Sequence, residues 1–101
     1  MEKRYRILLA ARVRTQFLRH VEFLSRVSIA AAKQLRNDFK STLLRLMNNP
    51  YQFPIDIDLN PENTPYRKAI FGKRYKLLFI IDGESVFVDS VADCRQEIIA
   101  Y

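Results

Sequence analysis

The sequence predicts an α+β fold in which a helical hairpin packs on one face of an antiparallel-rich, four-stranded sheet, in the order β-α-α-β-β-β. Two observations support this prediction. Residues 11–48 repeat apolar side chains every three or four positions, which is the spacing of amphipathic helices. Residues 66–91 instead hold three short runs typical of strands, separated by the only two glycines of the chain.

A strand and two helices are predicted in the first half. The strand covers residues 5–10, and apolar residues at helical spacing predict one helix over 11–26 and another over 28–48. One or two residues separate the helices, so we expect them to fold back on each other and to be covered by a sheet. The side chains expected to be buried are Phe17, Val21, Leu24, Leu35, Phe39, Leu43 and Leu46, against Leu77, Phe79 and Ile81 or their alternates Leu78 and Ile80.

Local signals mark both ends of the second helix. Ser28 offers a side-chain oxygen that can cap its first turn. Asn48 and Asn49, followed by Pro50, are expected to end it. Asparagine accepts the left-handed conformation, and proline cannot continue the hydrogen-bond ladder of a helix.

All four prolines lie between the second helix and the last three strands, which predicts an irregular connection. Within it, residues 55–59 alternate Ile, Asp, Ile, Asp and Leu. A pair of carboxylates at this spacing can bind a divalent cation, but no other cluster of ligands accompanies it. We therefore expect an extended segment with buried isoleucines and with Asp56 and Asp58 in water, and we expect no metal and no cofactor.

Three strands are predicted over residues 66–71, 75–81 and 85–91. Gly72 and Gly83 separate them, and glycine tolerates the positive φ angles of tight hairpin turns. The three strands are therefore expected to form an antiparallel meander.

Length and cysteine content limit the class of protein. A chain of 101 residues supports one hydrophobic core, so residues 1–101 are expected to form a single domain. No apolar run approaches the roughly 20 residues of a membrane span, and residues 7–11 are too short for a signal peptide. The single Cys94 excludes an internal disulfide and fits a reducing compartment. We expect a cytoplasmic protein with no membrane partner.

The chain is basic, with seventeen Lys and Arg against eleven Asp and Glu, for a formal charge of +6. Such a surface attracts nucleic acids or acidic proteins. The cations of the first half are interpreted as the solvated side of the two helices, which is the usual place of Lys and Arg. Five further cations lie within ten residues of the first predicted turn of the meander and are interpreted as part of a polyanion site: Arg67, Lys68, Lys73, Arg74 and Lys76.

Two reactive residue types occur once each. His20 lies next to the apolar stripe of the first helix, and nothing in the sequence places it near the basic cluster, so it is interpreted as a partly buried or interfacial residue and not as a general base. Cys94 precedes Arg95, which favours a reactive thiolate, but no positioned base is visible for nucleophilic catalysis. Cys94 is therefore interpreted as a small buried residue.

Three short motifs lie in the last third of the chain. They are Tyr66-Arg67, Tyr75-Lys76-Leu77-Leu78-Phe79 and Asp93-Cys94-Arg95-Gln96. Together with the predicted order of elements, these motifs resemble the RelE/ParE superfamily of bacterial toxins over nearly the whole chain. The resemblance implies the toxin of a type II toxin–antitoxin module, which arrests growth and is neutralised by a cognate antitoxin protein, expected to be acidic or amphipathic.

The superfamily has two mechanistic branches. RelE-like members cut mRNA in the ribosomal A site, whereas ParE-like members inhibit DNA gyrase and need no catalytic residues. The predicted hairpin over residues 11–48 is closer in length to ParE-like proteins, and Cys94-Arg95-Gln96 is similar to the end of their last strand. These features favour a gyrase inhibitor, with metal-independent mRNA cleavage by 2′-hydroxyl attack as the alternative.

For the mRNA-cleaving alternative, the resemblance places Arg67, Lys76 and Arg95 at the positions of catalytic cations. It places Tyr101 at the position of a tyrosine that can transfer a proton. The three cations are expected to approach one region of the sheet, because two begin neighbouring strands and one follows the last. Cations that stabilise the phosphorane and an acid for the leaving oxygen are what this reaction requires.

This set departs from the RelE pattern. Ala69 stands where a second lysine is expected, and only Glu62 is available as a loop glutamate to act as a base. Tyr101 is the last residue of the sequence given, and chain ends tend to fray. Three further cations are expected to bind nucleic acid or a protein target: Lys68, Lys73 and Arg74.

Overall fold

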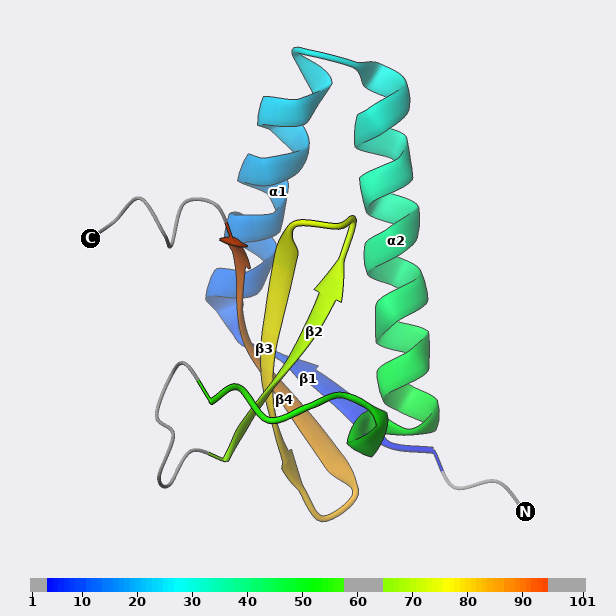
Figure 1. Ribbon diagram of the computed structural model, residues 1–101, viewed down its shortest axis with the longest axis vertical. Helices are drawn as coiled ribbons and strands as arrows, with labels where there is room; N and C mark the ends of the chain where they lie inside the picture. Colours follow the sequence, from blue (N-terminus) through cyan, green and yellow to red (C-terminus); the bar gives the residue numbers. More distant parts are fainter. Residues whose placement is uncertain (1–3, 58–64, 95–101) are drawn as a thin grey trace.

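The computed structural model describes residues 4–57 and 65–94 of the chain. Within these residues, two helices pack against a four-stranded sheet, which confirms the α+β prediction (Figure 1). Every strand and α-helix lies within two residues of its predicted bounds. The elements are β1 (Arg6–Leu9), α1 (Ala11–Ser25), α2 (Ile29–Asn48), the 3-10 helix η1 (Pro50–Gln52), β2 (Tyr66–Phe71), β3 (Tyr75–Asp82) and β4 (Ser85–Asp93).

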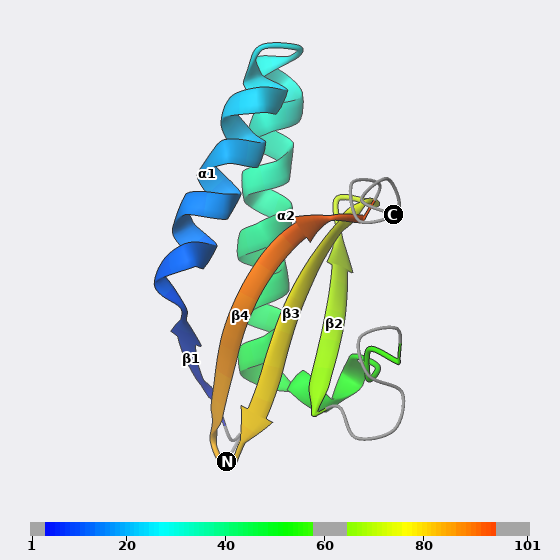
Figure 2. The same ribbon diagram turned by 90° about the vertical axis from the view of Figure 1, so that its left-hand side faces the viewer.

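The sheet is mixed, with strand order β1-β4-β3-β2. The β2–β3 and β3–β4 pairs are antiparallel, so the predicted meander is confirmed. The β1 strand pairs in parallel with β4, since the helical hairpin between β1 and the meander acts as a long crossover. Figure 2 shows β2, β3 and β4 curving alongside the two helices.

The buried core lies between the hairpin and one face of the sheet. Phe17 of α1 and Phe39 of α2 stack on each other at 4.1 Å between ring centroids, and both contact Phe71 of β2. Leu35 and Leu46 are buried as predicted, and of the two alternate sets in β3, Leu77 and Phe79 belong to this core, although Leu78 is buried as well. The other predicted core residues on this face are half-buried against the same cluster: Phe17, Val21, Leu24, Phe39, Leu43 and Ile81.

The ends of α2 agree with the prediction in position but only partly in mechanism. The Ser28 hydroxyl accepts a hydrogen bond from the Ala31 backbone N–H at 3.1 Å, as expected of an N-cap. Asn49, however, is extended, with φ of −158°, and not left-handed. Its side chain instead accepts from the Tyr51 N–H at 3.1 Å and caps η1, whose first residue is Pro50. The helix therefore ends because a second, tighter helix begins.

The two glycine turns differ in how closely they are packed. Gly72 and Gly83 both have φ of +58°, as predicted for the turns of the meander. A Cβ atom at Gly72 would lie 3.2 Å from Leu35 Cδ1 and 3.3 Å from Tyr75 Cδ2, whereas one at Gly83 would meet no atom within 4 Å. The β2–β3 turn is thus held against α2, and the β3–β4 turn is open.

Gly72→Ala is therefore expected to destabilise the fold more than Gly83→Ala. At either site a left-handed alanine costs roughly 1–2 kcal/mol. Overpacking against Leu35 and Tyr75 adds about 1–3 kcal/mol at Gly72 alone. Urea denaturation of the two variants measures the difference, and equal losses would show that α2 and the turn separate without cost.

Candidate functional site

The structure separates Arg67 and Lys76 on the two faces of the sheet. In the β2–β3 register, Arg67 pairs with Phe79, which faces the helices, whereas Lys76 pairs with Ile70. Side chains alternate between the faces of a strand, so Lys76 points to the face turned away from the helices, here called the open face. The expectation that these cations approach one region was wrong. Because β2 and β3 are antiparallel, their first residues lie at opposite ends of the sheet, and the two side chains also point to opposite faces.

Arg67 joins β2 to the segment after α2. Its Nη1 donates a hydrogen bond to the backbone carbonyl of Phe53 at 2.7 Å, and its guanidinium lies 5.2 Å from the ring centroid of Tyr51. Both contacts are made to other parts of the same chain, so Arg67 is interpreted as a residue that stabilises the fold.

On the open face, two lysines flank one carboxylate. Lys76 Nζ lies 3.1 Å from Asp56 Oδ2, and Lys68 Nζ lies 4.0 Å from Asp56 Oδ1. Asp56 is 0% exposed, and Lys76 is also buried. Because a buried ammonium is costly unless it is paired, Asp56 stabilises the charge of Lys76 inside the fold.

The segment that carries Asp56 is oriented opposite to the prediction. Ile55 is 45% and Ile57 63% exposed, while Asp56 between them is fully buried. The Asp56 N–H donates to the Tyr66 carbonyl at 2.9 Å and the Lys68 N–H donates to the Pro54 carbonyl at 3.0 Å, which fixes this register beside β2. The expectation of buried isoleucines and a solvated Asp56 was wrong because the lysines of the open face require a counter-ion. Asp58 lies outside the described residues.

A second charged group surrounds the β2–β3 turn. Arg74 Nε lies 3.4 Å from Asp93 Oδ2, at ion-pair distance but without hydrogen-bond geometry. The guanidinium of Arg74 also lies 5.1 Å from the centroid of Tyr75. Lys73 is exposed, with φ of 70°. Cys94 is only half-buried, not buried as expected, and its N–H donates to the Arg74 carbonyl at 2.7 Å.

His20 also belongs to this second group, a position that nothing in the sequence indicates. Its ring contacts Tyr75 edge-on at 5.1 Å between centroids. Burial lowers the pKa of His20 below its ordinary value, and Arg74 acts in the same direction. A hydrogen bond to the backbone of Val91 and the charge of Asp93 oppose this pKa shift. The neutral imidazole is thus favoured, in agreement with the predicted partial burial.

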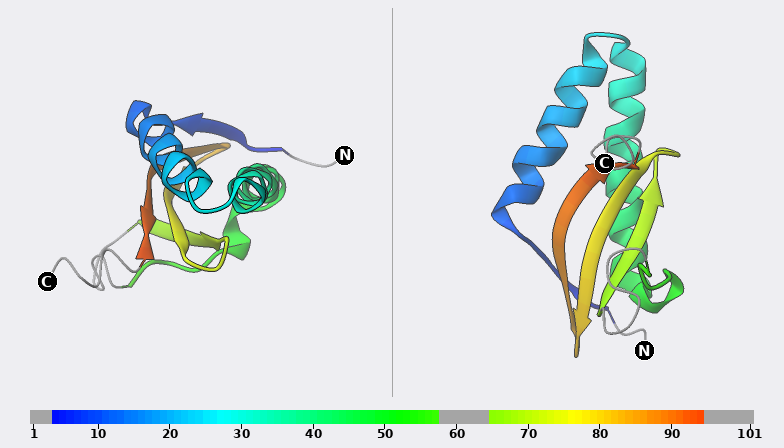
Figure 3. Two further views of the ribbon diagram at one scale, coloured as in Figure 1. Left: turned by 90° about the horizontal axis from the view of Figure 1, so that it is seen from above. Right: turned by 60° about the vertical axis from the view of Figure 1, so that its left-hand side comes forward.

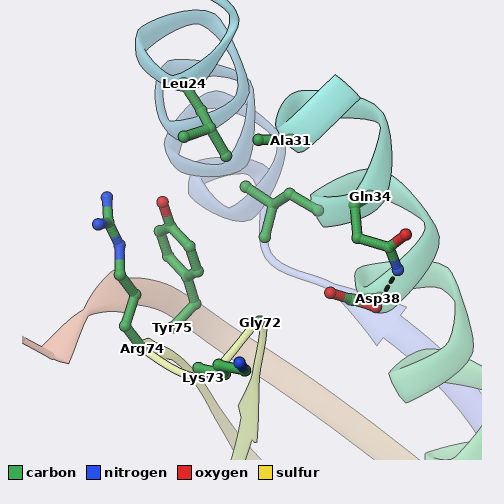
Figure 4. A pocket seen from close by; sticks show the side chains of 9 residues that line it. Leu24, Ala31, Gln34, Asp38, Gly72, Lys73, Arg74 and Tyr75 are labelled. Carbon is green, nitrogen blue, oxygen red and sulfur yellow. Dashed lines mark hydrogen bonds between the residues drawn. The ribbon is translucent and has the colours of Figure 1, made fainter. Parts of the chain in front are cut away.

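A pocket of about 300 Å³ opens between the turn and the hairpin (Figure 4). Leu24, Leu35 and Tyr75 form apolar walls, and the cations Lys73 and Arg74 line the turn side. On the α2 side, the Gln34 amide donates to Asp38 Oδ1 at 2.9 Å. The pocket can hold a small apolar group, with charges of both signs at its edges.

The predicted catalytic set is not assembled within the part of the chain that the structure describes. Arg95, Tyr101 and Glu62 lie outside that part. Lys68, which was assigned to binding only, shares the open face with Lys76, whereas Ala69 is buried on the helix side. Among residues 4–57 and 65–94, no group of three or more His, Cys, Asp or Glu side chains is placed to hold a metal ion.

Asp56 was not identified from the sequence as the buried carboxylate that pairs with the lysines of the open face. The one available signal was the alternation of Asp with Ile at residues 55–58, which is compatible with either orientation of the segment. The choice between a buried Asp56 and buried isoleucines depends on the position of Lys76, whose ammonium lies beside Asp56 in the folded protein.

No model of a known protein family matches the chain, and a search of the curated proteins finds no match. Within the described ranges, neither helix is both long and apolar enough to span a bilayer. Function is therefore inferred from the fold, the charged groups and the sequence motifs.

Proposed function

We propose that this chain is the toxin of a type II toxin–antitoxin module and that it acts as a ParE-like inhibitor of DNA gyrase. Support for the toxin class comes from the resemblance of its motifs, together with a fold of the kind that the resemblance implies. A cognate acidic or amphipathic antitoxin and DNA gyrase are the partners of this proposal, and cytoplasmic localisation is part of it.

The observation that favours inhibition over catalysis is the placement of the two described catalytic candidates. A ribonuclease must direct its cations at one phosphate, where negative charge develops in the transition state. Here Arg67 contacts the Phe53 carbonyl on the helix side, and Lys76 is paired with buried Asp56 on the open face. Because they lie on opposite faces of the sheet, the two cations cannot contact one phosphate together in this conformation.

The dimensions of the hairpin also support the ParE-like branch. Helix α1 has 15 residues and α2 has 20, so the hairpin extends beyond the end of the sheet, as Figure 1 shows. A protein inhibitor needs an extended surface for its target and no reactive groups.

Ribosome-dependent mRNA cleavage is the second candidate, and one observation favours it. Lys68 and Lys76 lie on the same open face, on the two sides of Asp56. A phosphate that displaced Asp56 would meet both cations. Metal-independent cleavage by the 2′-hydroxyl would then depend on these lysines together with Arg95 and Tyr101.

Two assays with the purified chain separate these functions. We expect inhibition of gyrase supercoiling and no cleavage of a defined mRNA on purified ribosomes. Tyr101→Phe removes only a hydroxyl, so it is expected to leave gyrase inhibition unchanged. In a ribonuclease, the same substitution or Arg95→Ala would reduce the rate by roughly ten- to a thousand-fold. Ribosome-dependent cleavage abolished by Arg95→Ala would overturn the proposal.

A further inference from the structure

The net positive charge of the chain resides in the helical hairpin. Residues 11–48 contain eight of the seventeen Lys and Arg side chains but only two of the eleven Asp and Glu. The hairpin therefore accounts for the whole formal charge of +6, and the remaining nine cations and nine acids of the sequence cancel. A long-range attraction for anionic partners is thus directed at the helices and not at the sheet.

Ion pairs within the fold increase this difference in charge between the sheet and the hairpin. Lys68 and Lys76 are within ion-pair distance of Asp56, and Arg74 is within ion-pair distance of Asp93. Three cations of α2 are instead exposed, and they take part in none of the ion pairs of the described residues: Lys33, Arg36 and Lys40. These three are available to a partner.

The exposed cations of α2 are in line with two exposed aliphatic residues. Intervals of four, three, four and four residues place five side chains on one side of the helix, here called the α2 stripe: Ile29, Lys33, Arg36, Lys40 and Leu44. Ile29 is 68% and Leu44 49% exposed. At 1.5 Å per residue, the stripe is about 22 Å long, which is the length of a helix of roughly four turns.

The α2 stripe faces away from the sheet. Gln34 and Asp38, which line the pocket at the β2–β3 turn, lie on the opposite side of the buried Leu35 row from Arg36 and Lys40. The view from above in Figure 3 shows the two helices side by side, with the meander along one side of them. No described element covers the exposed stripe.

We propose that the α2 stripe docks an acidic amphipathic helix of a protein partner. The three central cations would pair with acidic side chains, and Ile29 and Leu44 would bury against apolar side chains near the two ends of the partner helix. Interfaces between proteins combine arginine with apolar contacts, whereas interfaces with nucleic acid are more polar and are formed mainly with phosphates. The exposed Ile29 and Leu44 therefore favour a protein over a nucleic acid.

This inference rests on the part of the proposed function that expects an acidic or amphipathic antitoxin, because it assigns the α2 stripe to a partner of that chemistry. The peptide assay below measures only recognition of an acidic helix, whereas the gyrase and ribosome assays measure the effect of the chain on its target. Loss of the α2 stripe as a binding site with gyrase inhibition intact would contradict this inference alone, and absence of gyrase inhibition with peptide binding intact would contradict the proposed function alone.

The test uses the full chain and a fluorescent 21-residue peptide of Glu and Leu, patterned as an amphipathic helix. Binding is measured by fluorescence anisotropy at low and high salt. The triple variant K33E/R36E/K40E is expected to weaken binding by at least roughly ten-fold at low salt. The control R4E/R6E/R14E makes the same change of charge at exposed sites outside α2, and we expect a loss of less than about three-fold.

A second pair of variants tests the apolar part of the stripe. I29Q/L44Q is expected to weaken binding roughly ten-fold, and to do so at high salt as well, because burial of apolar surface is not screened. I57Q/I70Q removes two exposed isoleucines outside the hairpin and is expected to have no effect. Circular dichroism confirms that each variant is folded, and K40E alone is expected to give a smaller loss in the same direction.

Three results would overturn the inference. Equal losses from the two triple charge variants would mean that net charge alone attracts the peptide. Tighter binding of a single-stranded or duplex oligonucleotide than of the peptide, with the same dependence on Lys33, Arg36 and Lys40, would mean a nucleic-acid surface. Self-association in sedimentation velocity that is lost in I29Q/L44Q would mean that a second copy of the chain covers the stripe.

Discussion

Asp56→Ala is expected to lower the free energy of unfolding by about 3–5 kcal/mol, because it removes the buried carboxylate paired with Lys76. Asp56 is 0% exposed, and Lys76 Nζ is 3.1 Å from it. Without this carboxylate, the ammonium of Lys76 stays in a poorly solvated position on the open face. A typical domain has a total stability of only about 5–15 kcal/mol, so the variant is expected to be close to unfolding at room temperature.

Two control variants test whether the loss of stability comes from the unpaired buried charge of Lys76. Asp82→Ala removes an exposed carboxylate at the end of β3 and is expected to change stability by less than about 0.5 kcal/mol. The double variant Asp56→Leu/Lys76→Met removes both charges and is expected to recover most of the loss, since apolar replacements of buried ion pairs are often tolerated. Urea denaturation of all three variants provides the measurement. A loss for Asp56→Ala as small as that for Asp82→Ala would show that the pair is solvated.

Phe79→Ala is expected to destabilise the fold by about 3–5 kcal/mol through the cavity that it leaves. Phe79 lies in the central part of the sheet, is fully buried on the helix side, and contacts Phe53 edge-on at 5.9 Å between ring centroids. The strand beside it pairs Val88 with Phe79, so no described neighbour is free to fill the space without moving the strands.

Phe87→Ala is the matched control for this prediction. Phe87 lies on β4, pairs with Ile80 and is exposed on the open face. Its replacement is expected to cost about 1 kcal/mol, because Phe87 is 43% exposed and less apolar burial is lost than at Phe79. Thermal and urea unfolding of the two variants compare the faces of the sheet directly. Similar losses would contradict the assignment of the core to the helix side.

Local chemistry made most of the fold predictable. The helices follow from apolar spacing, the start of α2 from the Ser28 hydroxyl, and the meander from Gly72 and Gly83, whose φ angles are positive as expected. Each of these features depends on residues a few positions apart. The burial of Leu35 could be predicted for the same reason, whereas the sequence left open whether Phe79 or its alternates Leu78 and Ile80 face the helices.

The candidate site was less predictable, because it depends on which strand ends and faces meet. Arg67 and Lys76 are each the second residue of a strand, directly after a tyrosine, yet the antiparallel register places them on opposite faces of the sheet. His20 is distant in sequence from Arg74 and Asp93, and only the packing of α1 on the sheet brings their charges close enough to influence its pKa.

By itself, the sequence determined the elements, their order and the apolar side of each helix, since these depend on local periodicity and turn chemistry. Tertiary structure alone decided that Asp56 is buried while Ile55 and Ile57 are exposed. The alternating segment fits either orientation locally, and the choice depends on the electrostatic need of Lys76, twenty residues away, for a buried counter-ion. Tertiary structure also places Lys68 and Lys76 beside Asp56 and leaves Lys33, Arg36 and Lys40 of α2 exposed, a difference that the sequence alone does not show.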